Sequence, residues 1–292
     1  MDSTPSKKIL DGREASIALK DSLVPRIERL STAGIIPGLA TVIVGDDPAS
    51  KIYVSLKHKA CKELDIASFQ HELEANTSMN KIESLIARLN DDDRVHGILV
   101  QVPLPGHLDP EQIITWIDPR KDVDGFHPSN VGRLMRGQIE GTLVSCTPAG
   151  IMYLLVEHHG IDLTGMEVVI VSRSNIVGKP LIPLFLQQDA TVTTCHTKTK
   201  KLAFHTRRAD LVIAGTGQPK MFTKEYFSDG VIIVDVGIHR IDGNLCGDVD
   251  FEDVLPVASK ITPVPGGVGP MTIAALMRNT VQSAEALHGN RG

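Results

Sequence analysis

The sequence predicts an α/β protein with parallel sheets, divided into two domains. Runs of β-branched and other apolar residues recur along the chain with helical patterns between them, and this alternation is typical of parallel sheets. Most of the runs are apolar throughout rather than alternating, as expected for strands covered by helices on both faces. The predicted strands are residues 39–44, 98–102, 168–171, 191–194, 211–214 and 231–236.

Two sheets are expected rather than one, because residues 103–147 hold no strong strand pattern and are rich in Pro, Gly and Asp. We place the domain boundary near Cys146 and Thr147, so that the predicted domains span residues 1–146 and 147–270. The four strands of the second domain recur about every twenty residues, which is the rhythm of a doubly wound, Rossmann-like unit. A final helix is predicted over residues 271–287, opened by Pro270.

Composition and charge exclude several classes of function. The 292 residues are 42% hydrophobic and 22% charged, which is typical of a globular protein. The net charge is 30 − 35 = −5 without a dense basic block, so nucleic acid is not an expected partner. The apolar runs fall far short of the roughly 20 residues that cross a bilayer, and residues 1–12 lack an apolar signal core. Four scattered cysteines without a CxxC pair predict reduced thiols and a cytoplasmic location.

The densest chemical signal is the segment VGDDPASKIYVSLK, residues 44–57. Asp47 is a predicted helix cap, and Tyr53 and Lys57 then fall one turn apart on one helical face. Ile52, Leu56 and Leu64 form a neighbouring stripe that can pack inward. A solvated surface pair is the plain alternative. Tyr-x-x-x-Lys is also the catalytic pair of short-chain dehydrogenases, but in that family the glycine-rich turn precedes the pair, and here the nucleotide-type repeats follow it.

A second group of polar residues follows the predicted strand 98–102. Gln101 stands at the carboxyl end of that strand, where open α/β sheets bind ligands, although a loop amide satisfying it is equally expected. Asp122 and Asp124 precede the turn at Gly125, but the segment lacks the further oxygen ligands of a calcium loop. We therefore predict no metal site.

The turn after the strand 168–171 reads SRSNIVGKP and lacks the glycine pattern of an ordinary dinucleotide fingerprint. Arg173, Ser174 and a helix N-terminus form a predicted anion site, with an idle basic loop as the alternative. The next strand is followed by His196, Thr197 and Lys198, where an NAD site would place an acidic residue. A 2′-phosphate would meet hydrogen-bond donors there.

Glycines end the two later strands in AGTGQP and VDVGIH, and a Pro/Gly loop, TPVPGGVGPMT, precedes the last helix. Glycine lets a ligand approach the backbone closely. Eight segments resemble, in order and over about residues 9–283, the bifunctional methylenetetrahydrofolate dehydrogenase/methenyltetrahydrofolate cyclohydrolase family. They are the three just named and VGDDPASKIYVSLKHKAC, GILVQVPLP, KDVDGFHPSNVGRL, CTPAGI and SRSNIVGKP. Ser172 stands where the family usually has glycine, and His239 stands near the expected nicotinamide end where it usually has asparagine.

The resemblance implies two domains around a cleft, with the last helix, residues 271–292, completing the first domain, and a homodimer. It implies oxidation of 5,10-methylenetetrahydrofolate with NADP, then hydrolysis of the methenyl product to 10-formyltetrahydrofolate. By position, Lys57 would be the central catalytic group, Gln101 would hold it, Tyr53 would flank the pterin and Asp124 would bind its amino-pyrimidine edge. Substrate contacts would come from Val100, Val102, Pro265, Gly266, Gly267, Val268 and Gly269, and NADP contacts from Ser172, Arg173, Ser174, Thr197 and Ile238.

These roles agree with the chemistry. Hydride transfer requires mainly that two rings are held in contact in a dry site. Hydrolysis requires a water activated beside a cation, and a lysine held by a neutral glutamine can relay that proton. Two alternatives remain open: a monofunctional, NAD-linked dehydrogenase, which would not hydrolyse the methenyl compound, and a non-catalytic folate or nucleotide sensor, which would bind both ligands without turnover.

Overall fold

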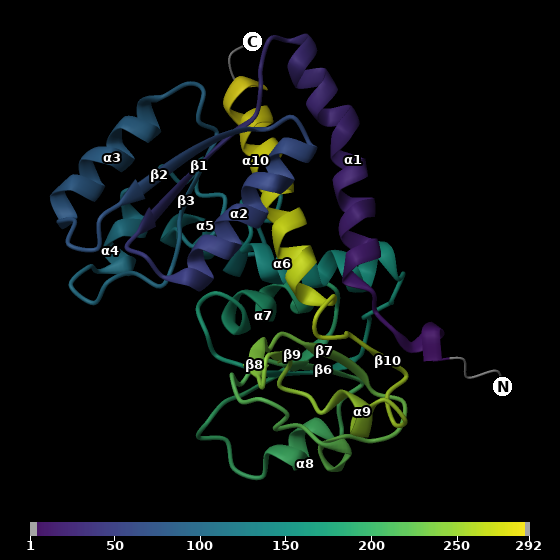
Figure 1. Cartoon of the computed structure of the whole chain (residues 1–292). Coiled ribbons are helices and arrows are strands. Elements are labelled where there is room, and N and C mark those ends of the chain that lie inside the picture. Colours follow the sequence, from purple (N-terminus) through teal and green to yellow (C-terminus); the bar gives the residue numbers. More distant parts are fainter. Residues whose placement is uncertain (1–4, 290–292) are drawn as a thin grey trace. The chain divides into compact units, whose positions relative to one another are not determined.

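The computed structural model describes residues 5–289, which form two compact α/β units (Figure 1). The first unit comprises residues 18–146 and 273–289, and the second comprises residues 5–17 and 147–272. The unit boundaries fall within α1 (Gly12–Thr32) and near the start of α10 (Val268–Gly289). No helix within residues 5–289 has both the length and the hydropathy needed to cross a membrane.

The first unit is built on a parallel sheet with the order β2-β1-β3. The central strand β1 is buried along its whole length, whereas β2 alternates between half-buried and exposed positions, as expected for an edge strand. The elements are β1 (Gly38–Val44), α2 (Pro48–Glu63), β2 (Ala67–Leu73), α3 (Met79–Asp91), β3 (Gly97–Val100), α4 (Pro110–Thr115) and α5 (Pro128–Met135).

The two faces of this sheet are covered by different helices. On one face, Ala40, Val42 and Val44 pack against the apolar stripe of α3 and against Ile113 of α4. Residues of the other parity face α2, where the hydroxyl of Thr41 lies 3.3 Å from Nε2 of His58. The strands therefore run between helices on both sides, and the polar groups of α2 are placed above the carboxyl ends of β1 and β3.

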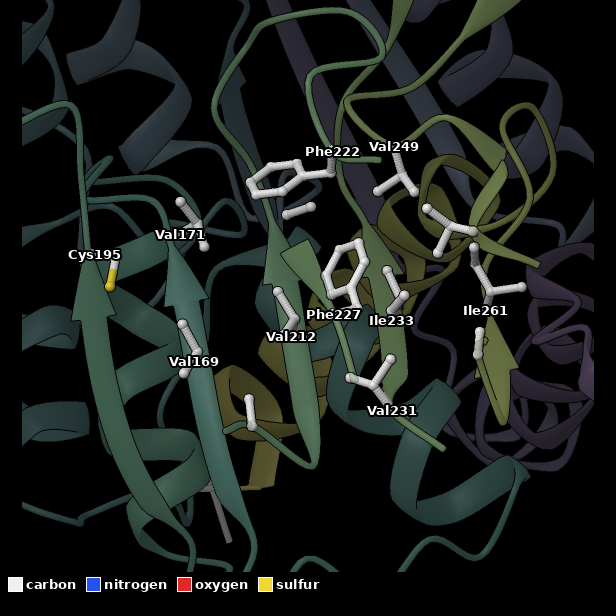
Figure 2. Close-up of a cluster of buried hydrophobic side chains, with 14 residues drawn as sticks. Val169, Val171, Cys195, Val212, Phe222, Phe227, Val231, Ile233, Val249 and Ile261 are labelled. Atoms are coloured by element: carbon white, nitrogen blue, oxygen red, sulfur yellow. The ribbon is translucent and has the colours of Figure 1, made fainter. Parts of the chain in front are cut away.

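The second unit is a five-stranded parallel sheet with the order β10-β7-β6-β4-β5. Its central strands β4, β6 and β7 are buried, and Figure 2 shows the cluster on one of its faces, in which Val169, Val212 and Ile233 meet Phe222 and Phe227. Its elements are η1 (Pro5–Lys8), α6 (Cys146–Met152), the π-helical η2 (Tyr153–His158), β4 (Glu167–Val171), α7 (Gly178–Leu186), β5 (Thr191–Cys195), α8 (Leu202–Thr206), β6 (Leu211–Ala214), η3 (Lys224–Tyr226), β7 (Ile232–Asp235), the hairpin β8 (His239–Ile241) and β9 (Asn244–Cys246), α9 (Phe251–Val254) and β10 (Lys260–Ile261).

The predicted fold class is confirmed, with some differences in detail. Each of the six predicted strands is present, but β3 ends at Val100, so that Gln101 and Val102 follow the strand instead of closing it. Residues 5–17 group with residues 147–272, because Ile9 bridges to Ile261 and the amide of Leu10 donates to the carbonyl of Ile261. Of the stripe that can pack inward, Leu64 is buried, but Ile52 and Leu56 are 61% and 44% exposed, so the prediction is wrong for these two residues.

Candidate active site

Tyr53 and Lys57 owe their positions to the way α2 begins. β1 ends at Val44, and the Asp47 carboxylate accepts the amide N–H of Ser50 at 2.8 Å, which caps the helix that opens with Pro48. Tyr53 and Lys57 then lie one turn apart on the face directed away from the core, with the Tyr53 side chain 41% exposed. The predicted convergence of a phenol and an ammonium on one face of a helix is therefore present.

Gln101 fixes the ammonium of Lys57. Nζ of Lys57 donates to Oε1 of Gln101 at 2.9 Å, and Nε2 of Gln101 donates to the carbonyl of Val102 at 2.6 Å. The amide N–H of Gln101 continues the sheet pattern by donating to the carbonyl of Val42 at 2.8 Å. Because both ends of the side-chain amide are bonded, its oxygen is held toward the lysine. Of the flanking valines, Val100 is buried and Val102 is 42% exposed.

Asp124 lies close enough to Lys57 for the two charges to interact. Burial raises the pKa of Asp124 to about 6, the positive charge of Lys57 acts to lower it, and the neighbouring carboxylate of Asp122 raises it further. A carboxyl with such a pKa changes its charge close to neutral pH. Perturbed carboxyl groups of this kind beside a lysine are typical of catalytic and binding sites.

Asp122 accepts several hydrogen bonds within its own loop. Its buried carboxylate accepts the backbone N–H of Phe126 at 3.2 Å and of His127 at 2.8 Å, and the side-chain amide of Asn130 at 2.9 Å. These bonds shape the turn at Gly125, where φ is +70°, and thereby present Asp124. Within residues 5–289 no group of three or more metal-ligating side chains is found.

The sequence did not single out Cys146 as a member of this site. Its buried thiol donates to the carbonyl of Val123 at 3.2 Å and lies 3.9 Å from Oδ1 of Asp124. Burial raises the pKa of this thiol well above its usual value, so that it remains a neutral donor. The side chain of Asn279 on α10 also bonds the carbonyls of Val123 and Val144, each at 2.8 Å. Such contacts join segments that are far apart in sequence, so only the folded chain reveals them.

The second unit places its predicted anion-binding residues at one edge of the sheet. In the β4–β5 register Val171 is opposite Cys195, so the turns that follow these strands lie side by side. Arg173 and Thr197, one from each turn, have exposed side chains. The hydroxyl of Ser174 accepts the amide N–H groups of Val177 at 3.1 Å and Gly178 at 3.2 Å, and this caps the start of α7.

The turn before α7 leaves room for a ligand only because of its small residues. A Cβ atom on Gly178 would lie 2.3 Å from the carbonyl oxygen of Ser172, so this glycine is required. Ser172 itself is 8% exposed, and its hydroxyl accepts the amide N–H of Ser174 at 3.4 Å. The extra side chain at position 172 therefore points into the turn, and Arg173 stays exposed. The turn fits a phosphate group, since the guanidinium of Arg173 is exposed and residues 193–199 hold no carboxylate.

The loop before α10 closes the other side of this sheet edge. A Cβ on Gly267 would lie 2.7 Å from the carbonyl of Pro263, and one on Gly269 would lie 3.8 Å from Cδ1 of Ile238. Ile238 is 47% exposed and follows β7. The predicted substrate loop and a predicted cofactor contact thus lie together in the second unit, whereas Tyr53, Lys57, Val100, Gln101, Val102 and Asp124 belong to the first unit.

Two family models match the chain over most of its length. Residues 10–124 match the catalytic domain of tetrahydrofolate dehydrogenase/cyclohydrolase, and residues 145–288 match the NAD(P)-binding domain of the same family. A curated relative, the bifunctional protein FolD of Acetivibrio thermocellus, is 51% identical over 279 residues, which cover 95% of this chain and 97% of the relative.

Solved structures agree with these matches. The bifunctional enzyme FolD, a methylenetetrahydrofolate dehydrogenase/cyclohydrolase from Campylobacter jejuni, has a TM-score of 0.93 and 48% identity, covering 96% of this chain and 99% of that one. The Trypanosoma brucei enzyme FolD, solved with NADP cofactor and an inhibitor, has a TM-score of 0.90 and 35% identity, with coverages of 96% and 97%. The chain therefore belongs to the tetrahydrofolate dehydrogenase/cyclohydrolase family.

Proposed function

We propose that this chain oxidises 5,10-methylenetetrahydrofolate to 5,10-methenyltetrahydrofolate with NADP, and that it hydrolyses the methenyl product to 10-formyltetrahydrofolate. The observation that carries the proposal is the 2.9 Å bond from Lys57 to Gln101, with the half-buried carboxyl of Asp124 close to the same lysine. Because the chain belongs to the tetrahydrofolate dehydrogenase/cyclohydrolase family, we take a tetrahydrofolate derivative as the substrate of these residues. The products are carriers of one-carbon units, such as those that purine biosynthesis consumes.

Lys57 acts as the central acid/base group of the hydrolysis. The methenyl carbon is already cationic, so the barrier lies in removing a proton from the attacking water and in handing a proton to the departing ring nitrogen. Gln101 is neutral, so it holds the lysine without placing a negative charge beside it. Its bond to the carbonyl of Val102 keeps Oε1 directed at Nζ. Because Nζ is held in one place, the neutral amine can take a proton from the attacking water in a fixed geometry, and the ammonium so formed can hand that proton to the departing ring nitrogen.

Asp124 and Tyr53 bind and orient the pterin. An ionised Asp124 accepts charge-assisted hydrogen bonds from the amino-pyrimidine edge, which carries two adjacent donors. Tyr53 presents a half-exposed ring on the same face of α2 as Lys57, and a flat pterin can stack on it. Val100 and Val102 supply apolar walls for the pterin in the first unit.

The second unit binds NADP, which supplies the hydride-accepting nicotinamide ring when it is bound. Arg173 and Thr197 bind the 2′-phosphate, and Ser172 and Ser174 shape the turn that carries Arg173. Ile238 contacts the cofactor farther along the same sheet edge. Accordingly, we assign folate chemistry to the first unit, residues 18–146 with 273–289, and dinucleotide binding to residues 147–270 of the second unit.

A homodimer is the proposed assembly. β2 is at the edge of its sheet and is paired with β1 on one side, and edge strands that remain open invite pairing with another chain. Light scattering of the purified protein tests this, since a mass of twice 31.6 kDa is expected. The cytoplasm is the proposed location, because the four cysteines are free thiols, as in proteins of reducing compartments.

The deciding experiment is a spectrophotometric assay of the purified chain with methylenetetrahydrofolate and either NADP or NAD, which follows formation and decay of the methenyl product. We expect formation with NADP and decay faster than the uncatalysed rate. Turnover with NAD and no accelerated decay would identify a monofunctional dehydrogenase instead. Binding of both ligands without turnover would identify a sensor.

A further inference from the structure

Asp248 is a buried carboxylate that joins two loops of the second unit. It is fully buried and lies between β9 and α9. One oxygen, Oδ2, accepts the hydroxyl of Thr216 and the amide N–H of Gly217, each at 2.9 Å, and also the amide N–H of Thr216. The other oxygen, Oδ1, lies 2.7 Å from Nε2 of His239. This hydrogen bond holds the ring of His239 against the buried carboxyl of Asp248.

The two loops that Asp248 joins follow neighbouring strands at the ligand-binding edge of the sheet. Thr216 and Gly217 follow β6, and His239 follows β7 by a few residues. In the β6–β7 register Ala214 is opposite Asp235, so both loops leave the sheet at the same end. The carboxyl ends of parallel strands are where such sheets bind dinucleotides.

A second buried carboxylate fixes Asp248 to the backbone. Asp235 accepts the amide N–H groups of Gly237 at 2.9 Å, Asp248 at 3.0 Å and Val249 at 2.9 Å. Packing here is tight, since a Cβ on Gly237 would lie 2.2 Å from Oδ1 of Asp248. Burial raises the pKa of Asp235 to about 6, as expected for two carboxyl groups that share a dry site. Asp248 is thus held in place by the bonds to both of its oxygens and to its amide. The His239 side chain, 20% exposed, makes the bond to Oδ1.

We infer that His239 is a positioning residue for the nicotinamide half of the cofactor, which acts through Asp248 on Ile238 and on the turn of residues 215–217. The inference rests on the proposed NADP-dependent function. Arg173 and Thr197 are at the β4–β5 end of the sheet, so a dinucleotide whose 2′-phosphate they bind extends its other half over β6 and β7. There it meets Ile238, the residue before His239, and the glycine turn after β6.

The hydrogen bond between His239 and Asp248 orders both Ile238 and the glycine turn of residues 215–217. Without it, Ile238 and the β8–β9 hairpin lose their only side-chain bond to the buried carboxylate among the described residues. The loop then pays an ordering cost each time the dinucleotide binds. Weaker binding of the nicotinamide half follows, and the loss is the same for NADP and NAD because the 2′-phosphate is bound elsewhere.

The test compares His239→Ala, His239→Gln and, as a matched control on the same hairpin, Arg240→Ala, which removes an exposed side chain bonded to the carbonyl of Gly243. We expect His239→Ala to raise KM for NADP and for NAD by about the same factor, tenfold or more. KM for the folate, the cyclohydrolase rate and Tm should change little. His239→Gln should restore KM, because its Nε2 reaches the position of the ring nitrogen. Arg240→Ala should behave as the wild type.

A second variant keeps the inference testable if His239→Ala does not fold. Thr216→Val removes the hydroxyl bond to Oδ2 of Asp248 and keeps the side-chain shape, so it should also raise KM for both dinucleotides equally. Unchanged KM values in an active enzyme would overturn this inference alone. Equal losses of both activities would show a purely structural role and would also overturn it. A wild-type chain without NADP-dependent oxidation would overturn the proposed function and this inference with it.

Discussion

We expect the protonation state of Asp124 to control binding of the folate. Its carboxylate faces Lys57, and it can accept two hydrogen bonds from an amino-pyrimidine. Charge-assisted bonds contribute about 1.5–3 kcal/mol each. Asp124→Ala should therefore weaken binding of tetrahydrofolate by at least about tenfold and leave the Kd for NADP unchanged, as measured by fluorescence titration. If both affinities fell equally, the 122–130 turn would have only a structural role.

The pH dependence of folate binding follows from the same group. The pKa of Asp124 is raised from 3.8 to about 6, so the acceptor form predominates above that pH and disappears below it. The affinity for tetrahydrofolate should fall as the pH drops from 7.5 to 5.5, which titration at successive pH values will show. In Asp124→Asn the dependence in this range should vanish. A wild-type affinity independent of pH through this range would mean that the carboxyl is not the acceptor.

Arg173 should determine the preference for NADP over NAD. It is exposed at the end of β4, and the adjacent turn at Thr197 holds no acidic residue that would repel a phosphate. Together with Thr197, the guanidinium should contribute on the order of 3 kcal/mol, a factor of roughly 10² in affinity. We expect Arg173→Ala to lose most of this preference in kcat/KM, and Lys179→Ala, whose ammonium is bonded to Asn175, to keep it. Retention of the preference by Arg173→Ala would place the 2′-phosphate elsewhere.

Among the elements, the turn from β4 into α7 is the part that backbone geometry constrains most strongly. A Cβ on Gly178 would lie 2.3 Å from the carbonyl of Ser172, whereas a Cβ on Gly132 in α5 meets nothing within 4 Å. Gly178→Ala should therefore displace Arg173 and raise KM for NADP tenfold or more, with the cyclohydrolase rate retained. Gly132→Ala serves as the control and should leave both activities unchanged. An unaltered KM in Gly178→Ala would show that the turn does not hold the cofactor.

Elements with both faces buried could be predicted from the sequence, and those at edges could not. β1, β6 and β7 are continuous apolar runs, so their positions were predicted to within two residues. β2 escaped notice because ASFQHEL alternates between half-buried and exposed positions and carries polar side chains. The stripe of Ile52, Leu56 and Leu64 on α2 is buried only at Leu64, because helical spacing alone does not say which part of a helix is covered.

The site shows the same division between local and long-range information. Asp47, Tyr53 and Lys57 belong to one helix, so their arrangement follows from sequence spacing. Gln101 was predicted because it follows an apolar strand, although its bond to Lys57 crosses from β3 to α2. Cys146 and Asn279 could not be predicted, because their contacts with the Val123–Asp124 backbone depend on how distant segments pack.

At the scale of the whole molecule, we expect the two units to contribute differently to the two proposed activities. The acid/base group, its glutamine and the perturbed carboxyl belong to the first unit, and the phosphate-binding turns belong to the second. Variants of the phosphate-binding turns should therefore impair hydride transfer and spare hydrolysis. Variants at Lys57 should impair hydrolysis whether or not the cofactor is present.

The most direct test of the proposed mechanism is the hydrolysis rate of methenyltetrahydrofolate by Lys57→Met, which keeps the apolar stem and removes the ammonium. Lys59→Met, an exposed lysine on the same helix, is the matched control. Acid/base groups contribute roughly 10²- to 10⁴-fold, so we expect a loss of that size in Lys57→Met, with Tm unchanged, and a wild-type rate in Lys59→Met. A correctly folded Lys57→Met that retains more than a tenth of the wild-type rate would contradict the assignment of Lys57 as the catalytic group.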